Sequence, residues 1–71
     1  MKRDLSQDLQ QIQTHLGNGR FTAGISLCRE VLTYAPSDPN ALYLLGLGAA
    51  QLGDATTTRE AFYAAWQITP E

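Results

Sequence analysis

The chain has 71 residues, the length of a single small domain. Five Lys and Arg residues against seven Asp and Glu residues give a formal net charge of −2. This charge argues against a surface for nucleic acid or an anionic membrane, because both require clustered cations. Apolar residues make up 44% of the chain and charged residues 17%, a composition too hydrophobic for intrinsic disorder.

The sequence offers neither a targeting segment nor a covalent staple. The N-terminus lacks the apolar run of a signal peptide, and no uncharged stretch reaches the roughly 20 residues of a membrane span, so we expect a cytoplasmic protein. One cysteine excludes an intramolecular disulfide, and no Cys/His cluster has metal-ligand spacing, so we expect no metal and no cofactor. A domain this small then depends on good helix packing or on another chain.

The first half of the chain predicts two helices. Residues Leu5, Leu9, Ile12 and Leu16 form an apolar stripe at i, i+4, i+7 and i+11, which is typical of an amphipathic helix. Gly17-Asn18-Gly19 ends this helix. A second helix runs from about Arg20 to Tyr34 and stops before Pro36.

The second half predicts two more. Asp38 and Pro39 are an N-cap and a first-turn proline for a helix from about Pro39 to Leu52, which is apolar nearly all round and therefore expected to be buried on most sides. Gly53-Asp54 separates it from a fourth helix, from about Ala55 to Thr69, which Pro70 closes. With four helices and no strand, the predicted fold is all-α.

The chain is also weakly similar to itself. When it is shifted so that Gly19 aligns with Gly53, three further identities appear: Asp4 with Asp38, Thr22 with Thr56 and Pro36 with Pro70. Three of the four fall at a helix start, a turn and a terminating proline. We call this alignment the repeat shift. The single domain, residues 1–71, is therefore interpreted as repeat 1 over about 4–37 and repeat 2 over about 38–71.

A helix–turn–helix unit of about 34 residues resembles the tetratricopeptide repeat (TPR). In the second unit Leu45-Gly46, Phe62, Ala65 and Pro70 match that pattern, whereas Leu42, Ala49 and Thr58 depart from it. In the first unit Gly24, Cys28 and Pro36 match, and Gln11-Ile12 replaces Leu-Gly. The resemblance implies two antiparallel helix-turn-helix repeats stacked as a short right-handed α-solenoid.

Three glycines lie inside predicted helices: Gly24, Gly46 and Gly48. Each costs about 1 kcal/mol relative to alanine, so packing must require them. We expect Gly24, Gly46 and Ala65 to let neighbouring helices approach closely. Leu45, Phe62 and Trp66 are expected to fill the space between helices.

Nothing in the sequence indicates an enzyme. His15 lies near the end of the first helix, where it suits the helix dipole, and no nucleophile is placed to use it. Cys28 lies in an apolar row, which indicates a buried, unreactive thiol. The carboxylates stand singly rather than as an acid/base pair.

A binding surface is the remaining function. In TPR proteins the first helix of each repeat lines a concave groove that holds a partner peptide. By resemblance the groove residues here are Ser6, Leu9, Gln10, Gln13, Asn40, Tyr43, Leu44, Leu47 and Gln51. The Lys, Arg and Asn clamp that some relatives use for a C-terminal carboxylate is absent, so an apolar or amphipathic segment of a protein or peptide partner fits better. The alternative is that Tyr43, Leu44 and Leu47 belong to the core.

The last helix carries aromatic side chains on more than one side. We expect Phe62, Tyr63, Trp66 and Ile68 to form an oligomer interface, most simply of a homodimer. The primary hypothesis is thus a TPR-like adaptor or assembly surface that also self-associates. Two alternatives stay open: that the chain is the N-terminal TPR part of a larger protein, for example a transferase, and that self-association is itself the function.

Overall fold

Four α-helices joined by short turns make up the computed structural model, which describes residues 4–68. The helices are α1 (Leu5–Gly17), α2 (Phe21–Tyr34), α3 (Pro39–Gln51) and α4 (Ala55–Ile68). No strand occurs in the described range, so the predicted all-α fold with four helices is confirmed. Thr69 and Pro70, predicted to end the last helix, lie outside the described residues.

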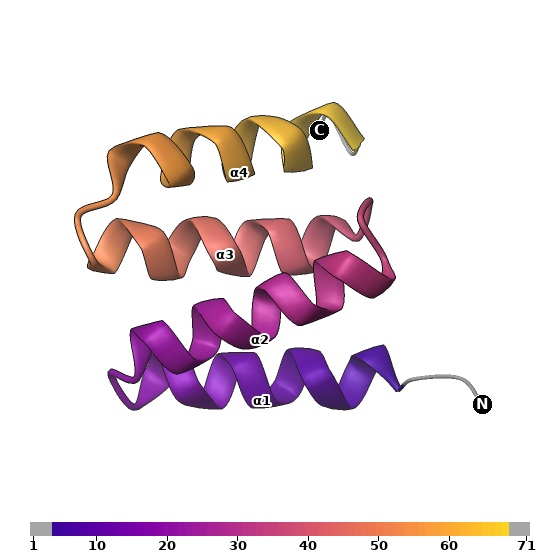
Figure 1. The fold of residues 1–71 in the computed structure, drawn as a ribbon, viewed down its shortest axis with the longest axis vertical. Helices are drawn as coiled ribbons and strands as arrows, with labels where there is room; N and C mark the ends of the chain where they lie inside the picture. The colour runs from indigo at the N-terminus through magenta and orange to yellow at the C-terminus, as the bar shows by residue number, and fades with distance from the viewer. Residues whose placement is uncertain (1–3, 69–71) are drawn as a thin grey trace.

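The helices stack in chain order, as Figure 1 shows, with α1 at one end and α4 at the other. Each helix packs on its neighbour in the sequence, and α1 also touches α3. Consequently α2 and α3 are each covered on two sides, whereas α4 packs on α3 alone among the described elements. The all-round hydrophobicity of α3 is explained by this interior position.

The turns that close the two hairpins have the same structure. Gly19 and Gly53, which the repeat shift aligns, are left-handed with φ of 77° and 78°. The N–H group that follows each glycine donates back to the preceding helix, from Arg20 to the His15 carbonyl (2.8 Å) and from Asp54 to the Ala49 carbonyl (2.9 Å). This is a Schellman-type helix end, which glycine favours because it lacks a Cβ. The two turns that the repeat shift aligns therefore share one backbone geometry.

Aspartates begin three of the helices. The carboxylates of Asp4, Asp38 and Asp54 accept backbone N–H groups of the first turn at 2.9–3.3 Å. The hydroxyl of Thr57 also donates to Asp54 (2.7 Å), and these bonds lower the pKa of the Asp54 carboxyl. By contrast, α2 begins after Arg20 without a side-chain cap. The predicted N-cap at Asp38 is confirmed.

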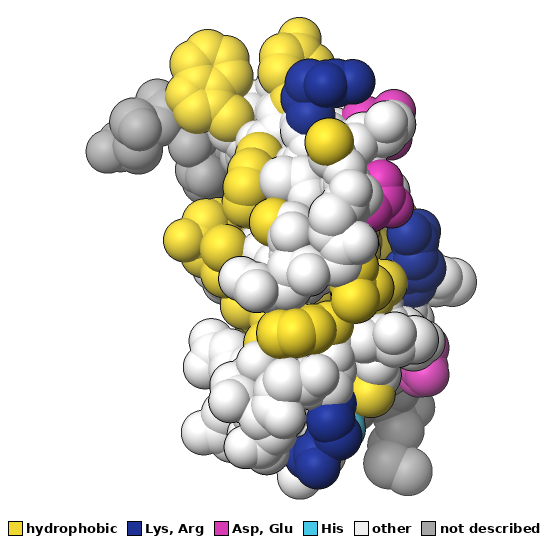
Figure 2. Space-filling model, turned by 90° about the vertical axis from the view of Figure 1, so that its left-hand side faces the viewer, with side chains coloured by type: hydrophobic (Ala, Val, Ile, Leu, Met, Phe, Trp, Pro, Cys, Tyr) yellow, Lys and Arg dark blue, Asp and Glu magenta, His cyan; other side chains and the backbone are white. Residues whose placement is uncertain are grey.

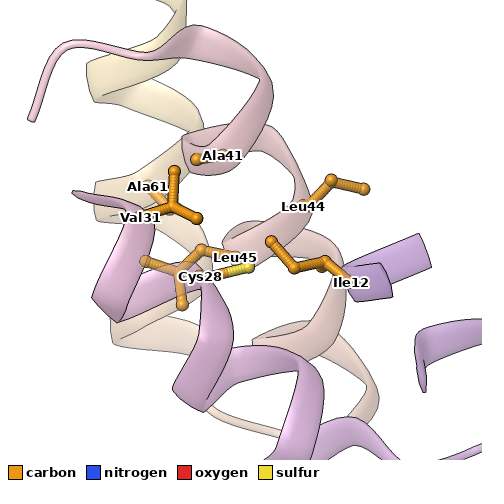
Figure 3. Close-up of a cluster of buried hydrophobic side chains, with 7 residues drawn as sticks. All are labelled: Ile12, Cys28, Val31, Ala41, Leu44, Leu45 and Ala61. Carbon is orange, nitrogen blue, oxygen red and sulfur yellow. The ribbon is translucent and has the colours of Figure 1, made fainter. Parts of the chain in front are cut away.

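The core is a small cluster of buried side chains from all four helices, drawn in Figure 3: Ile12, Cys28, Val31, Ala41, Leu44, Leu45 and Ala61. Cys28 is fully buried, as the sequence predicted. Burial raises the pKa of its thiol to about 11, with the nearby Arg29 charge opposing the shift, because the thiolate would lose its hydration.

The three helical glycines lie at helix contacts. A Cβ on Gly46 would overlap the Phe62 ring of α4, with Cδ1 2.6 Å away, and a Cβ on Gly24 would meet Leu16 Cδ2 of α1 at 2.8 Å. A Cβ on Gly48 would come within 3.0 Å of Ile25 in α2. The prediction that packing requires these glycines is confirmed.

The expected role of Trp66 is wrong. Leu45 is buried and Phe62 is half-buried against α3, but the indole of Trp66 is 58% exposed. The reason is its position on α4, on a side that no described helix covers. Trp66 therefore belongs to the surface rather than to the space between helices.

Candidate interaction surface

A row of exposed side chains runs along α3. Tyr43, Leu47 and Gln51 follow one another at i, i+4 and i+8, which places them on one face of the helix. The Tyr43 side chain is 53% exposed and that of Leu47 is 37% exposed. We call these three residues the α3 row.

One end of the α3 row borders a shallow hollow of about 440 Å³. Its lining consists of Leu47 and Gln51 together with residues from the α1–α2 turn region: Leu16, Gly17 and Phe21. The lining is mainly apolar, with the Gln51 amide as a polar group. Such a site suits an apolar side chain that is flanked by a hydrogen-bonding group.

The other end of the α3 row is supported by α4. The rings of Tyr43 and Phe62 lie 5.7 Å apart, tilted by 36°. Since Phe62 itself lies over Gly46, the absence of a side chain at Gly46 lets the Phe62 ring settle where it can support Tyr43.

The predicted groove residues of α1 lie elsewhere. Gln10 and Gln13 line a separate, polar hollow on α1 with Gln7, Gln11 and Thr14. Leu9 is half-buried and packs against the core cluster, and Ser6 is exposed. Thus none of the four predicted groove residues of α1 lines the hollow that Leu47 and Gln51 share with Leu16 and Gly17.

Leu44, which was also predicted to line the groove, is buried in the core instead. It is only 6% exposed and belongs to the core cluster with Ile12 of α1, as Figure 3 shows. Because α1 touches α3, the face that would have been open on an end helix is covered here. For Leu44 the core alternative is therefore correct, while Tyr43 and Leu47 are exposed. Asn40 is also exposed, and its backbone N–H is held by Asp38.

Sequence reasoning did not assign Leu16, Gly17 and Phe21 to this surface. The repeat shift pairs Gly17 with Gln51, which was a usable signal for one of them. Phe21 carried no such signal, because its place beside α3 depends on how the α1–α2 turn packs on the end of α3.

The residues predicted for an oligomer interface do not share one face of α4. Phe62 is half-buried, Tyr63 is 62% exposed and Ile68 is 40% exposed. Helical residues two apart point in nearly opposite directions, so Ile68 lies away from Trp66. Phe62, Tyr63 and Trp66, by contrast, are related by i+1, i+3 and i+4 steps and share one side.

The remaining reactive groups have structural surroundings. The Nδ1 atom of His15 accepts a hydrogen bond from Arg20 Nε (3.2 Å), which links the end of α1 to the following turn. Within residues 4–68 no three His, Cys, Asp or Glu side chains gather as a metal site would need. In the same range no helix has both the length and the hydrophobicity of a membrane-spanning segment.

Comparison with protein-family models, with curated proteins and with solved structures finds no match for this chain.

Proposed function

We propose that the chain is a cytoplasmic protein–protein interaction module that holds an apolar or amphipathic segment of a partner along the α3 row. One observation carries this proposal: Leu47 is exposed between an apolar hollow and the supported ring of Tyr43. Exposed aromatic and aliphatic anchors on a rigid helix are typical of recognition surfaces.

The dimensions of the α3 row suit a short segment. Tyr43 and Gln51 are separated by two helical turns and a fraction, which is about 12 Å along the helix at roughly 1.5 Å per residue. A partner helix presents side chains at i and i+7 over a similar length, about 10 Å. One apolar side chain of the partner would enter the hollow at Leu47 and a second would contact Tyr43.

We further propose that the two hairpins are TPR-like repeats. Support comes from the two glycine turns that the repeat shift aligns and from the contact between Gly46 and Phe62, both residues of the TPR pattern. In TPR proteins the first helix of a repeat lines the binding groove, and α3 is the first helix of the second hairpin.

The experiment is selection from a displayed library of random peptides, followed by measurement of affinity in solution. Leu47→Asp places a charge at the centre of the surface, and we expect the selected peptides to bind this variant at least about ten-fold more weakly. Ile68→Asp is the matched control, because Ile68 is apolar and 40% exposed, close to the 37% of Leu47, but lies on α4.

Circular dichroism must show both variants to be as helical as the parent chain. Peptides that bind Leu47→Asp and the parent equally well would contradict the proposal. So would a library that yields no binder sensitive to this variant.

A further inference from the structure

The outer side of α4 carries an aromatic face that the proposed groove does not use. It consists of Tyr63 and Trp66, with Arg59 one turn before them. Phe62 borders this face but packs over Gly46 of α3. Tyr63 and Trp66 are 62% and 58% exposed, the highest values among the large hydrophobic side chains of residues 4–68. Figure 2 shows hydrophobic side chains reaching the surface over the α4 end of the molecule, while the α1 end is mostly polar.

The equivalent face of α2 shows what such a face does. The repeat shift pairs Arg59, Phe62 and Trp66 with three residues of α2: Ile25, Cys28 and Leu32. In α2 these positions face the stack: Ile25 lies against Gly48 of α3, Cys28 is fully buried and Leu32 packs on the core. Phe62 keeps this role, because it packs over Gly46 of α3. Arg59 and Trp66 occupy the register of a helix-packing face too, but both are exposed.

We propose that this aromatic face binds the same face of a second copy of the chain, with the two α4 helices antiparallel across a two-fold axis. A two-fold interface must be complementary to itself. This face meets that condition in an antiparallel pair, because one end of the face then lies opposite the other end of its copy. One end carries the Arg59 cation, and the other end, two turns further on, carries the Trp66 indole ring. An axis between Phe62 and Tyr63 brings Arg59 of each copy opposite Trp66 of the other, the arrangement of a cation–π contact.

The same register avoids repulsion. The two Arg59 side chains would be separated by about two helical turns, or roughly 10 Å along the helices. Charges at that distance on a surface are largely screened at physiological salt. A parallel pairing would instead put Arg59 against Arg59.

The area available limits the strength of the pair. Aromatic side chains bury about 150–250 Å² each, so the exposed parts of Tyr63 and Trp66 amount to on the order of 250 Å² per copy at 62% and 58%. A pair would bury on the order of 500 Å² of aromatic surface, below the roughly 1,200 Å² of stable complexes. We therefore expect a weak dimer of the transient class.

Sedimentation equilibrium from about 10 to 500 µM tests the pairing. The weight-average mass should rise from 7.8 kDa toward twice that value. Trp66→Ser should weaken the dimer at least about ten-fold, since exposed aromatic anchors dominate such contacts. Ile68→Ser, on the far side of α4, should leave it unchanged. A parent chain that stays at 7.8 kDa throughout, or an Ile68→Ser variant that is as monomeric as Trp66→Ser, would overturn the proposal.

A charge exchange tests the antiparallel register. Trp66→Arg alone puts Arg opposite Arg59 of the second copy and should weaken the dimer at least about ten-fold. Adding Arg59→Glu in the same chain puts opposite charges together and should recover at least about three-fold in affinity. A double variant no tighter than Trp66→Arg would contradict the register. Circular dichroism must show that each variant is folded. We expect folded variants, because both positions are exposed.

Discussion

The two hairpins differ in which helix carries the larger of two side chains at equivalent positions: the first helix in the first hairpin and the second helix in the second hairpin. In the first hairpin the large Ile12 of α1 and the small Cys28 of α2 both lie in the buried core cluster. In the second hairpin the repeat shift places Gly46 and the large Phe62 at these positions. A large residue on either helix fills the space, provided that the residue opposite is small.

This exchange explains why the sequence repeat is faint. The side-chain volume summed over the two positions is similar in both hairpins, although the volume at each single position differs. The sequence identity between the hairpins is therefore low while the space between the helices stays filled. The turns cannot make such an exchange, because a left-handed residue requires glycine in both hairpins. Gly19 and Gly53 are therefore identical where the core residues are not.

The hairpins also differ in how they are covered. The second helix of the first hairpin, α2, lies between α1 and α3, whereas α4 packs on α3 alone in the described range. Leu32 of α2 consequently packs against the core, whereas Trp66, its equivalent under the repeat shift, is 58% exposed on α4. This difference leaves Tyr63 and Trp66, the most exposed aromatic side chains of the described range, on the end helix α4.

The largest expected effect on stability comes from creating a cavity in the core of the first hairpin. Ile12 is fully buried, so Ile12→Ala leaves a cavity and should lower the free energy of unfolding by about 3 kcal/mol. Urea denaturation followed by circular dichroism measures this loss. Leu52→Ala, at an exposed position, is the control and should change stability by less than about 0.5 kcal/mol.

The buried thiol of Cys28, in the first hairpin, makes the stability of the chain depend on pH in the alkaline range. Its pKa in the folded chain is about 11, above the ordinary 9.0. Because the pKa is raised in the folded state, the neutral buried thiol contributes to the stability of the fold. This contribution to stability is complete below pH 9 and is lost as the pH rises through 11. The parent chain should lose on the order of 2 kcal/mol by that pH.

Cys28→Ala is the reference for this titration, because it removes the ionising group. The difference in stability between the two chains should change between pH 9 and 11. A difference that is constant with pH would show that the thiol does not titrate in a buried site.

Overpacking the second hairpin should have a smaller effect. Gly46→Ala drives a methyl group into the Phe62 ring, which Tyr43 partly holds in place. The clash outweighs the gain in helix propensity, so we expect a net loss of about 1–2 kcal/mol. Gly17→Ala is a control, since a Cβ at Gly17 meets nothing within 4 Å. A Gly46→Ala chain as stable as this control would contradict the packing described.

Local signals were sufficient to predict the helices but not their surroundings. Asp38, Gly53 and Pro36 act within one turn of chain, so the helix ends could be predicted from them. Whether Leu44 or Trp66 is buried depends instead on which helix lies beyond α3 or α4. Leu44 was expected in the groove and is core, because α1 reaches α3. For Tyr43 and Leu47 the resemblance implies the groove while the sequence leaves the core alternative open, and both side chains are exposed.

The starts of α3 and α2 can also be compared, because a side-chain cap contributes about 1 kcal/mol to stability. The Asp38 carboxylate accepts two N–H groups at the start of α3, so Asp38→Ala should lower stability by about 1 kcal/mol. Arg20 precedes α2 without such a bond from its side chain, and Arg20→Ala should cost less than about 0.5 kcal/mol. Equal losses in thermal denaturation would show that the caps do not distinguish these helices.

The smallest expected effect is at Trp66. With the indole 58% exposed, Trp66→Ala should change the stability of the monomer by less than about 0.5 kcal/mol. Denaturation at low protein concentration measures it without a contribution from association. A loss of several kcal/mol would show that the indole is part of the core.

A double-mutant cycle between Gly46 and Phe62 tests the exchange of bulk most directly. In the parent chain Gly46→Ala should destabilise, but in a Phe62→Ala background the methyl group has room and the gain in helix propensity remains. We predict that the sign of the Gly46→Ala effect reverses, with a coupling energy of at least about 1.5 kcal/mol. An effect of Gly46→Ala that is the same in both backgrounds would contradict the account.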